Sequence, residues 1–212
     1  MMHADEFANA RRKMVRNQIA NRDIQNPDIL AAMEKIQRHL FVTHEYQKWA
    51  YQDRPLPIDK GQTISQPYIV ALMTDLLELT QNSKVLEIGT GCGYQTAVLA
   101  ELAKEVYSVE ILPELAESAK ERLEALNYRN VYLKQGNGYY GWIEYAPYDG
   151  ILVTAAPPKI PYRLTQQLAD GGRMAIPVGA ELQQLFLINK CSGKVETTTI
   201  TGVSFVPMTG TP

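Results

Sequence analysis

A short apolar strand that runs into three closely spaced glycines constrains this chain more than any other feature. The run Val85-Leu86-Glu87-Ile88 is followed at once by Gly89-Thr90-Gly91-Cys92-Gly93, and helix-forming residues begin at Tyr94. Glycine permits a tight turn and lets the backbone approach a ligand at the carboxyl end of a strand. The pattern therefore predicts a ligand site where a strand of an α/β sheet ends.

The rest of the chain beyond this turn alternates short apolar runs with helical segments. Strands are expected at 85–88, 106–109, 131–133 and 150–153, and helices at 94–103 and 113–126. This repeated order predicts a doubly wound α/β sheet of parallel strands. The apolar runs at 174–178, 185–188 and 195–206 follow without a helix between them. They predict an antiparallel hairpin that closes the sheet.

The first 80 residues have a different pattern. Helices are expected over 5–20, from Pro27 behind a capping Asn26, and from Pro67 to about residue 79. The segment 49–65, which contains prolines and a glycine, is longer than most connections. Loops of this length in compact domains are usually functional.

Composition excludes several classes of protein. The charges nearly balance, with 21 Lys and Arg against 23 Asp and Glu, so no nucleic-acid or membrane partner is expected. No apolar stretch approaches the roughly 20 residues that span a bilayer, and we expect a cytoplasmic protein. The two cysteines and three histidines do not have the spacing of a metal site. We therefore expect reduced thiols, surface histidines and no bound metal.

The glycine motif does not fit a dinucleotide site. That fingerprint needs glycines at i, i+2 and i+5, but the last position falls on Tyr94 or Thr96 here. An acid at Glu87 followed by glycines at alternate positions instead resembles the first motif of S-adenosylmethionine enzymes. That cofactor has no pyrophosphate, so no phosphate cradle is required.

Two further residues are candidates for cofactor contacts. Glu110 ends the next strand, where its carboxylate can accept both ribose hydroxyls. The alternative is an acid that stabilises the start of the helix at Pro113. Asn137, between Gly136 and Gly138, follows the third strand and could accept a hydrogen bond from the adenine amine. It could equally belong to a turn of no chemical importance.

Several stretches together resemble the protein-L-isoaspartate O-methyltransferases of bacteria and archaea. The resemblance covers nearly everything from about Phe41 to the C-terminus. Besides the glycine motif, it is carried by 53–58 (DRPLPI), 61–68 (GQTISQPY), 94–97 (YQTA), 141–142 (GW), 146–149 (APYD), 153–156 (VTAA), 171–173 (GGR), 176–179 (IPVG) and 205–207 (FVP). The specific segment is Thr63-Ile64-Ser65-Gln66-Pro67, because other methyltransferases share only the glycine motif.

The resemblance implies a Rossmann-like methyltransferase that methylates the free carboxylate of L-isoaspartyl residues in damaged proteins and peptides. It implies a mixed seven-stranded sheet in one domain, 1–212, with N-terminal helices and a substrate loop over 1–80 and the cofactor-binding sheet over 81–212. A monomer is expected. S-adenosylmethionine is the implied cofactor, held by Glu87, Gly89, Thr90, Gly91, Gly93, Glu110, Asn137 and Gly138. The implied substrate contacts are Ile64, Ser65, Gln66, Thr154, Ala155 and Val206.

Ser65 is the residue that we expect to hold the acceptor carboxylate. No Gly-x-Ser-x-Gly frame surrounds it, so it is not a hydrolase nucleophile. Its alternative role is to cap the helix that begins at Pro67. The chain also departs from the family at Asp59, Cys92, Asn137 and Ser204, where glycine, serine, aspartate and arginine are common.

Two other functions compete with this interpretation of the sequence. Ala156-Pro157-Pro158-Lys159 stands where methyltransferases of nucleic-acid amino groups carry a Pro-Pro motif, but the flanking Asn or Asp and the aromatic residue are missing. No basic cluster that could hold phosphates accompanies it. A cofactor-binding module without catalysis is the other alternative, in which Asn137 and Ser204 would mark lost activity.

Overall fold

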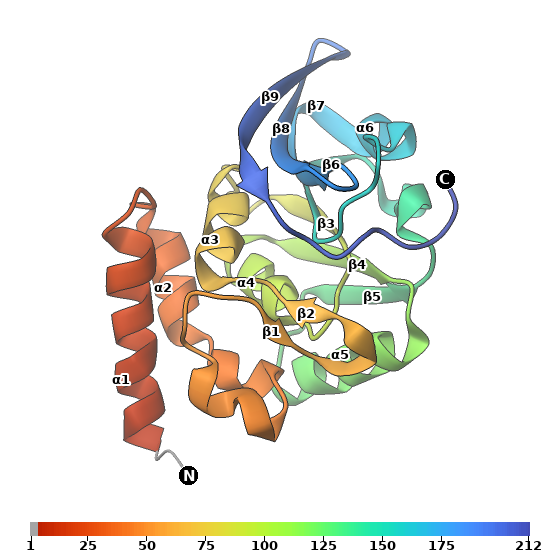
Figure 1. Ribbon diagram of the computed structural model, residues 1–212. Helices are drawn as coiled ribbons and strands as arrows, with labels where there is room; N and C mark the ends of the chain where they lie inside the picture. The colour runs from red at the N-terminus through yellow and green to blue at the C-terminus, as the bar shows by residue number, and fades with distance from the viewer. Residues whose placement is uncertain (1–3) are drawn as a thin grey trace.

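A seven-stranded sheet forms the centre of the computed structural model, which describes residues 4–212 (Figure 1). The strands are β3 (Lys84–Ile88), β4 (Glu105–Glu110), β5 (Val131–Gln135), β6 (Tyr148–Val153), β7 (Leu168–Val178), β8 (Gln183–Cys191) and β9 (Lys194–Val203). Their order is β5-β4-β3-β6-β7-β8-β9. The first five in this order pair in parallel, and β8 is antiparallel to both β7 and β9. The predicted mixed sheet with its closing hairpin is confirmed.

Helices lie between the strands and before the sheet. The α-helices are α1 (Ala4–Met14), α2 (Pro27–Lys35), α3 (Pro67–Asp75), α4 (Tyr94–Leu102), α5 (Pro113–Ala125) and α6 (Tyr162–Gln167). The shorter elements are η1 (Val15–Ala20), η2 (Arg38–Phe41), η3 (His44–Trp49), η4 (Asp59–Gly61), η5 (Gly138–Tyr140) and η6 (Ile143–Tyr145). Asn26 caps α2 as expected, because its Oδ1 accepts a hydrogen bond from Asp28 N at 3.0 Å. Helix α6 was not predicted.

Both faces of the sheet are covered, and β3 shows how. Side chains alternate between the two faces of a strand. Leu86 and Ile88 pack in the same cluster as Leu164 of α6, whereas Val85 packs in the cluster that contains Leu99 of α4. The centre of the sheet is therefore buried on both sides, as its continuous apolar runs require.

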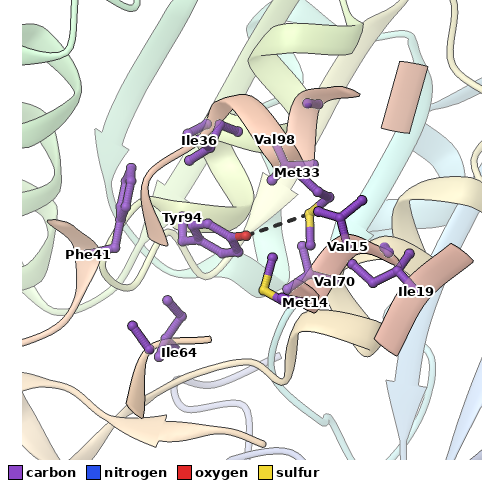
Figure 2. Close-up of a cluster of buried hydrophobic side chains, with 14 of the residues drawn as sticks. Met14, Val15, Ile19, Met33, Ile36, Phe41, Ile64, Val70, Tyr94 and Val98 are labelled. Carbon is purple, nitrogen blue, oxygen red and sulfur yellow. Dashed lines mark hydrogen bonds between the residues drawn. The ribbon is translucent and has the colours of Figure 1, made fainter. Parts of the chain in front are cut away.

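The N-terminal helices pack against α4 and position the loop that precedes α3. Figure 2 shows Met14 and Met33 beside Tyr94, the first residue of α4, whose hydroxyl lies 3.7 Å from Met33 Sδ, and Ile19 belongs to the same cluster. Ile64 lies in the same cluster and is only 3% exposed. The apolar contacts of Ile64 therefore hold the end of the loop close to the glycine turn before α4.

The expectation of surface histidines is wrong for His39. Its ring stacks on Phe7 with centroids 3.9 Å apart, and its Nδ1 lies 2.7 Å from the Tyr51 hydroxyl. Burial lowers the pKa of this imidazole below its ordinary value. His44 is exposed, as expected, and His3 lies outside the described residues. The stacked aromatic partner, which comes from a distant helix, explains why sequence spacing missed this buried position.

Candidate active site

The glycine turn after β3 is held tightly against the end of β6. Gly89 has φ +94°, a conformation that disfavours side chains. A Cβ atom added there would lie 2.2 Å from Thr154 Oγ1. That hydroxyl donates to the carbonyl oxygen of Gly89 at 2.7 Å and to that of Ile88 at 3.0 Å. Glycine is therefore required at position 89 for the two strand ends to meet.

Glu110, at the end of β4, closes the other side of the turn. Its Oε2 accepts a hydrogen bond from Gly91 N at 2.8 Å, and its Oε1 accepts one from Leu112 N at 3.0 Å. Through Leu112, the residue that precedes α5, the side chain thus stabilises the start of this helix, which is the alternative role expected from the sequence. Each carboxylate oxygen can accept a further hydrogen bond. Glu110 can therefore bind ribose hydroxyls while it keeps its two backbone partners.

A cavity lies at this carboxyl edge of the parallel strands and encloses about 790 Å³ free of protein atoms, including open solvent. Ten of the predicted site residues line it: Ile64, Ser65, Gly89, Thr90, Gly91, Glu110, Gly138, Thr154, Ala155 and Val206. Apolar side chains of Ile111 and Leu112 complete the wall beside Glu110. Backbone N–H groups, one carboxylate and apolar walls in a cavity of this size fit a nucleoside-containing cofactor.

Glu87 lies behind the glycine turn and not on the cavity wall. It is fully buried, and its Oε2 accepts hydrogen bonds from Thr96 Oγ1 at 2.5 Å and Ser108 Oγ at 2.6 Å. The Ser108 hydroxyl also lies 2.6 Å from that of Thr90, which does line the cavity. Burial raises the pKa of Glu87 to about 8. The carboxyl group thus supports the turn through a chain of hydroxyls. Gly93, also expected at the cofactor, is the cap residue that precedes α4, has φ +86° and lies off the cavity wall.

Asn137 is also absent from the cavity wall, and both of its polar side-chain atoms are engaged elsewhere. Its Oδ1 accepts a hydrogen bond from Tyr139 N at 3.0 Å, and its Nδ2 donates to the carbonyl oxygen of Thr211 at 2.7 Å. The neighbouring Gly138 does line the cavity, where a Cβ atom would lie 2.3 Å from Ile88 Cγ2. The structure thus gives Asn137 a capping role.

Ser65 lies between β2 (Thr63–Ile64) and α3, at the junction of two hollows. Within residues 4–212 its hydroxyl has no hydrogen-bond partner, and the cap position of α3 is Gln66, which makes no side-chain cap. Its alternative role as a helix cap is therefore not observed. Ser65 lines the cavity at the glycine turn and also an adjacent groove.

The adjacent groove runs from the loop before α3 to the end of β9. Its lining residues are Pro55, Thr63, Ser65, Gln66, Ile69, Glu181, Leu182, Gln183, Gly202, Val203, Ser204 and Phe205. On one side, β1 (Leu56–Pro57) pairs antiparallel with β2 and stiffens the loop. On the other side, Gln183 Oε1 accepts a hydrogen bond from Phe205 N at 2.6 Å, and its Nε2 donates to Phe205 O at 3.0 Å. Gln66, a predicted substrate contact, lines this groove and not the cavity.

Of the cavity wall that the C-terminal segment supplies, the sequence analysis predicted Val206 but missed Met208. Met208 lines the cavity, and its backbone is held beside the end of β6. Ala156 N donates to Val206 O at 2.9 Å, and Met208 N donates to Ala156 O at 2.8 Å. This contact joins segments about 50 residues apart, so no local pattern could reveal it. Ala156, from the Pro-Pro stretch, serves here as a backbone partner.

No metal or membrane feature is found in the described part of the chain. No group of three or more His, Cys, Asp or Glu residues there could hold an ion. None of the helices in residues 4–212 is long and apolar enough to cross a bilayer. Cys92 is buried and Cys191 is exposed, and both are free.

Comparison with known proteins gives one consistent result. The family model described as protein-L-isoaspartate(D-aspartate) O-methyltransferase matches residues 9–212. A protein-L-isoaspartate O-methyltransferase of Picosynechococcus sp. is 54% identical over 207 residues, which are 98% of this chain and 93% of the relative. The protein of that name in Methanoculleus marisnigri is 51% identical over 210 residues, or 99% and 96% of the two chains.

Solved structures agree with these sequence matches. A protein-L-isoaspartate O-methyltransferase superposes with a TM-score of 0.86 at 30% identity, over 94% of this chain and 66% of that longer chain. A Plasmodium falciparum structure in complex with S-adenosyl-L-homocysteine superposes with a TM-score of 0.82 at 24% identity, over 94% and 98%. At 24% identity, the second match shows that the two proteins have the same fold and nothing more.

Proposed function

This chain belongs to the protein-L-isoaspartate(D-aspartate) O-methyltransferase family, and we propose on this basis how its site methylates isoaspartyl residues. The reaction transfers the methyl group of S-adenosylmethionine to the free carboxylate of an L-isoaspartyl residue in a damaged protein or peptide. The resulting methyl ester begins repair. The observation that supports the assignment of roles is the position of Ser65, which borders both the cavity and the groove.

The cavity at the glycine turn holds the cofactor in this proposal. Glu110 accepts the ribose hydroxyls, and the backbone of Gly89 and Gly91 lies against the bound molecule. Ile111 and Leu112 provide apolar wall beside Glu110. S-adenosylmethionine supplies, when bound, a methyl group on a positively charged sulfur. Glu87 supports the turn from behind through Ser108.

Ser65 orients the acceptor. Its unpartnered hydroxyl donates a hydrogen bond to one oxygen of the substrate carboxylate and leaves the other oxygen free to attack. A carboxylate is ionised at neutral pH, so the enzyme needs neither a nucleophile of its own nor a strong base. Alignment then dominates catalysis, and well-oriented reacting groups can gain about 7–11 kcal/mol at the upper limit.

The proposal extends to the surroundings of the enzyme. We expect a cytoplasmic monomer that does not bind nucleic acid. Two free cysteines suit a reducing compartment, and nearly balanced charge gives no long-range attraction to polyanions. Sedimentation velocity of the purified chain tests both expectations. The sedimentation coefficient of the free protein should be that of a monomer, and it should not change when an RNA duplex is added.

A methyl-transfer assay tests the proposed function. The purified protein is incubated with S-adenosylmethionine carrying a tritiated methyl group and with a peptide that contains one L-isoaspartyl residue. The same peptide with a normal aspartyl residue is the control. Label should enter only the isoaspartyl peptide as a base-labile ester. Equal labelling of both peptides, or of neither, would contradict the assignment.

A further inference from the structure

The groove beside Ser65 carries one charged side chain, and its position bears on which damaged sites the enzyme selects. Among the described residues that line the groove, only Glu181 is charged. It forms no ion pair within residues 4–212. The carboxylate is therefore free to meet a charge on a bound chain.

The turn that carries Glu181 is fixed in place. Gly179 has φ +135°, and a Cβ atom there would lie 2.0 Å from the carbonyl oxygen of Leu182. Gly179 N also donates to Pro157 O at 3.0 Å. Gln183, two residues after Glu181, forms hydrogen bonds with both backbone groups of Phe205 across the groove. The turn that presents Glu181 is thus anchored on both sides, at Gly179 and at Gln183.

Leu182 adds an apolar contact on the same turn. This residue is 90% exposed, and it lines the groove beside Glu181. When a ligand covers a leucine this exposed, apolar surface is removed from water, which contributes favourably to the free energy of binding. The turn therefore offers both an anionic and an apolar contact at the groove that Ser65 borders.

We infer that Glu181 and Leu182 set the sequence preference of the enzyme around the damaged residue. The occupant of the groove is the peptide segment next to the isoaspartyl residue, because the groove is continuous with the site at Ser65. A lysine or arginine in that segment is favoured by Glu181, and an aspartate or glutamate is disfavoured. This inference rests on the proposed function.

A peptide series measures the preference. One reference peptide has neutral residues on both sides of the isoaspartyl residue. Each variant peptide carries one Lys or one Glu, placed at one of the three positions before or the three positions after the isoaspartyl residue. At one or two positions the Lys peptide should have a KM about two- to fivefold below that of the Glu peptide, the range of exposed ion pairs. The kcat should be unchanged, and the difference should shrink at high ionic strength.

Substitutions assign the preference to the turn. Glu181→Gln should abolish it and Glu181→Lys should invert it. Glu196→Lys is the matched control, since Glu196 is exposed on β9 outside the groove, and it should keep the wild-type preference. Leu182→Ser should raise the KM of all peptides by a similar factor, whatever their charge.

The inference and the proposed function fail in different ways. Methylation of the reference peptide together with the same Lys-to-Glu ratio of KM in wild type and Glu181→Lys would overturn only the inference. If the reference peptide is not methylated, the proposed function fails. Fluorescence anisotropy of labelled peptides, measured with S-adenosylhomocysteine present, then tests the charge preference as a ratio of Kd values. An unchanged ratio in Glu181→Lys overturns the inference there too.

Discussion

The hydroxyl of Thr154 donates a hydrogen bond to the carbonyl oxygen of Gly89 at 2.7 Å, and so joins the ends of two neighbouring parallel strands. The contact is possible because residue 89 has no side chain. It brings the turn after β3 and the end of β6 together on one wall of the cavity. The geometry of the site thus depends on packing between strands as well as on the glycine motif itself.

Gly89→Ala should destabilise the protein by about 2–5 kcal/mol, the sum of a strained backbone and an overpacked contact. Gly171→Ala is the matched control, since Gly171 also has a positive φ of 82° but nothing within 4 Å of an added Cβ. Urea unfolding measures both. Replacing Thr154 by alanine in the Gly89→Ala protein should restore part of the loss, and the absence of such rescue would contradict the steric explanation.

Ser65→Ala should leave the affinity for S-adenosylhomocysteine nearly unchanged and lower kcat/KM for an isoaspartyl peptide. One lost hydrogen bond to a charged acceptor corresponds to about 1–3 kcal/mol, or roughly five- to 150-fold in kcat/KM. Ser204→Ala makes the same chemical change in the groove, away from the cavity wall, and should have a much smaller effect. Unchanged turnover in Ser65→Ala would remove this residue from the mechanism.

Glu110→Gln should weaken cofactor binding more than it slows turnover at saturating cofactor. The amide can accept only on one side, so its NH2 group faces one of the two backbone donors, Gly91 N or Leu112 N. The loss of a charged acceptor costs about 1.5–3 kcal/mol. Titration calorimetry with S-adenosylhomocysteine measures it, and Glu114→Gln, an exposed residue on α5, is the control. Equal affinities in the two variants would argue against ribose binding by Glu110.

The raised pKa of Glu87 predicts a dependence of stability on pH. Burial moves this pKa from 4.5 to about 8, so between these values the folded state retains a proton that the unfolded state has lost. The free energy of unfolding of wild type should therefore fall relative to that of Glu87→Gln as pH rises from about 4.5 to about 8. The slope is at most about 1.4 kcal/mol per pH unit, and above pH 8 the difference should level off. Urea denaturation of both proteins at several pH values measures this difference in the free energy of unfolding, and a difference that does not change with pH would contradict the raised pKa.

Asn137→Ala should loosen the C-terminal segment and change cofactor affinity little. The substitution removes the bonds to Tyr139 N and Thr211 O, which together contribute about 1–2 kcal/mol. Hydrogen exchange at Met208 N should speed up, because that amide belongs to the segment that Asn137 ties down. A tenfold loss of affinity for S-adenosylhomocysteine would instead support a direct adenine contact by this side chain.

The parallel strands could be predicted from the sequence because most of them are local apolar runs, and because β3 and β4 are each followed by a helix of good helix-forming composition. The predicted strand 131–133 proved to be β5, Val131–Gln135, with the same start and two further residues at its carboxyl end. Helix α6 was missed because it is six residues long and has no strong periodic pattern. The short β1–β2 ribbon was also missed, since each of its strands has two residues.

The sequence by itself determined the succession of the longer strands and helices along the chain, the glycine turn and the segment around Ser65, because these depend on neighbours along the chain. Only the tertiary structure decided which side chains reach the cavity. Glu87 and Asn137 stand in the motif, yet a strand face directs the first toward α4 and a cap engages the second. Met208 reaches the cavity from the far end of the chain. Side-chain direction and contacts between distant segments arise from packing, which no local pattern encodes.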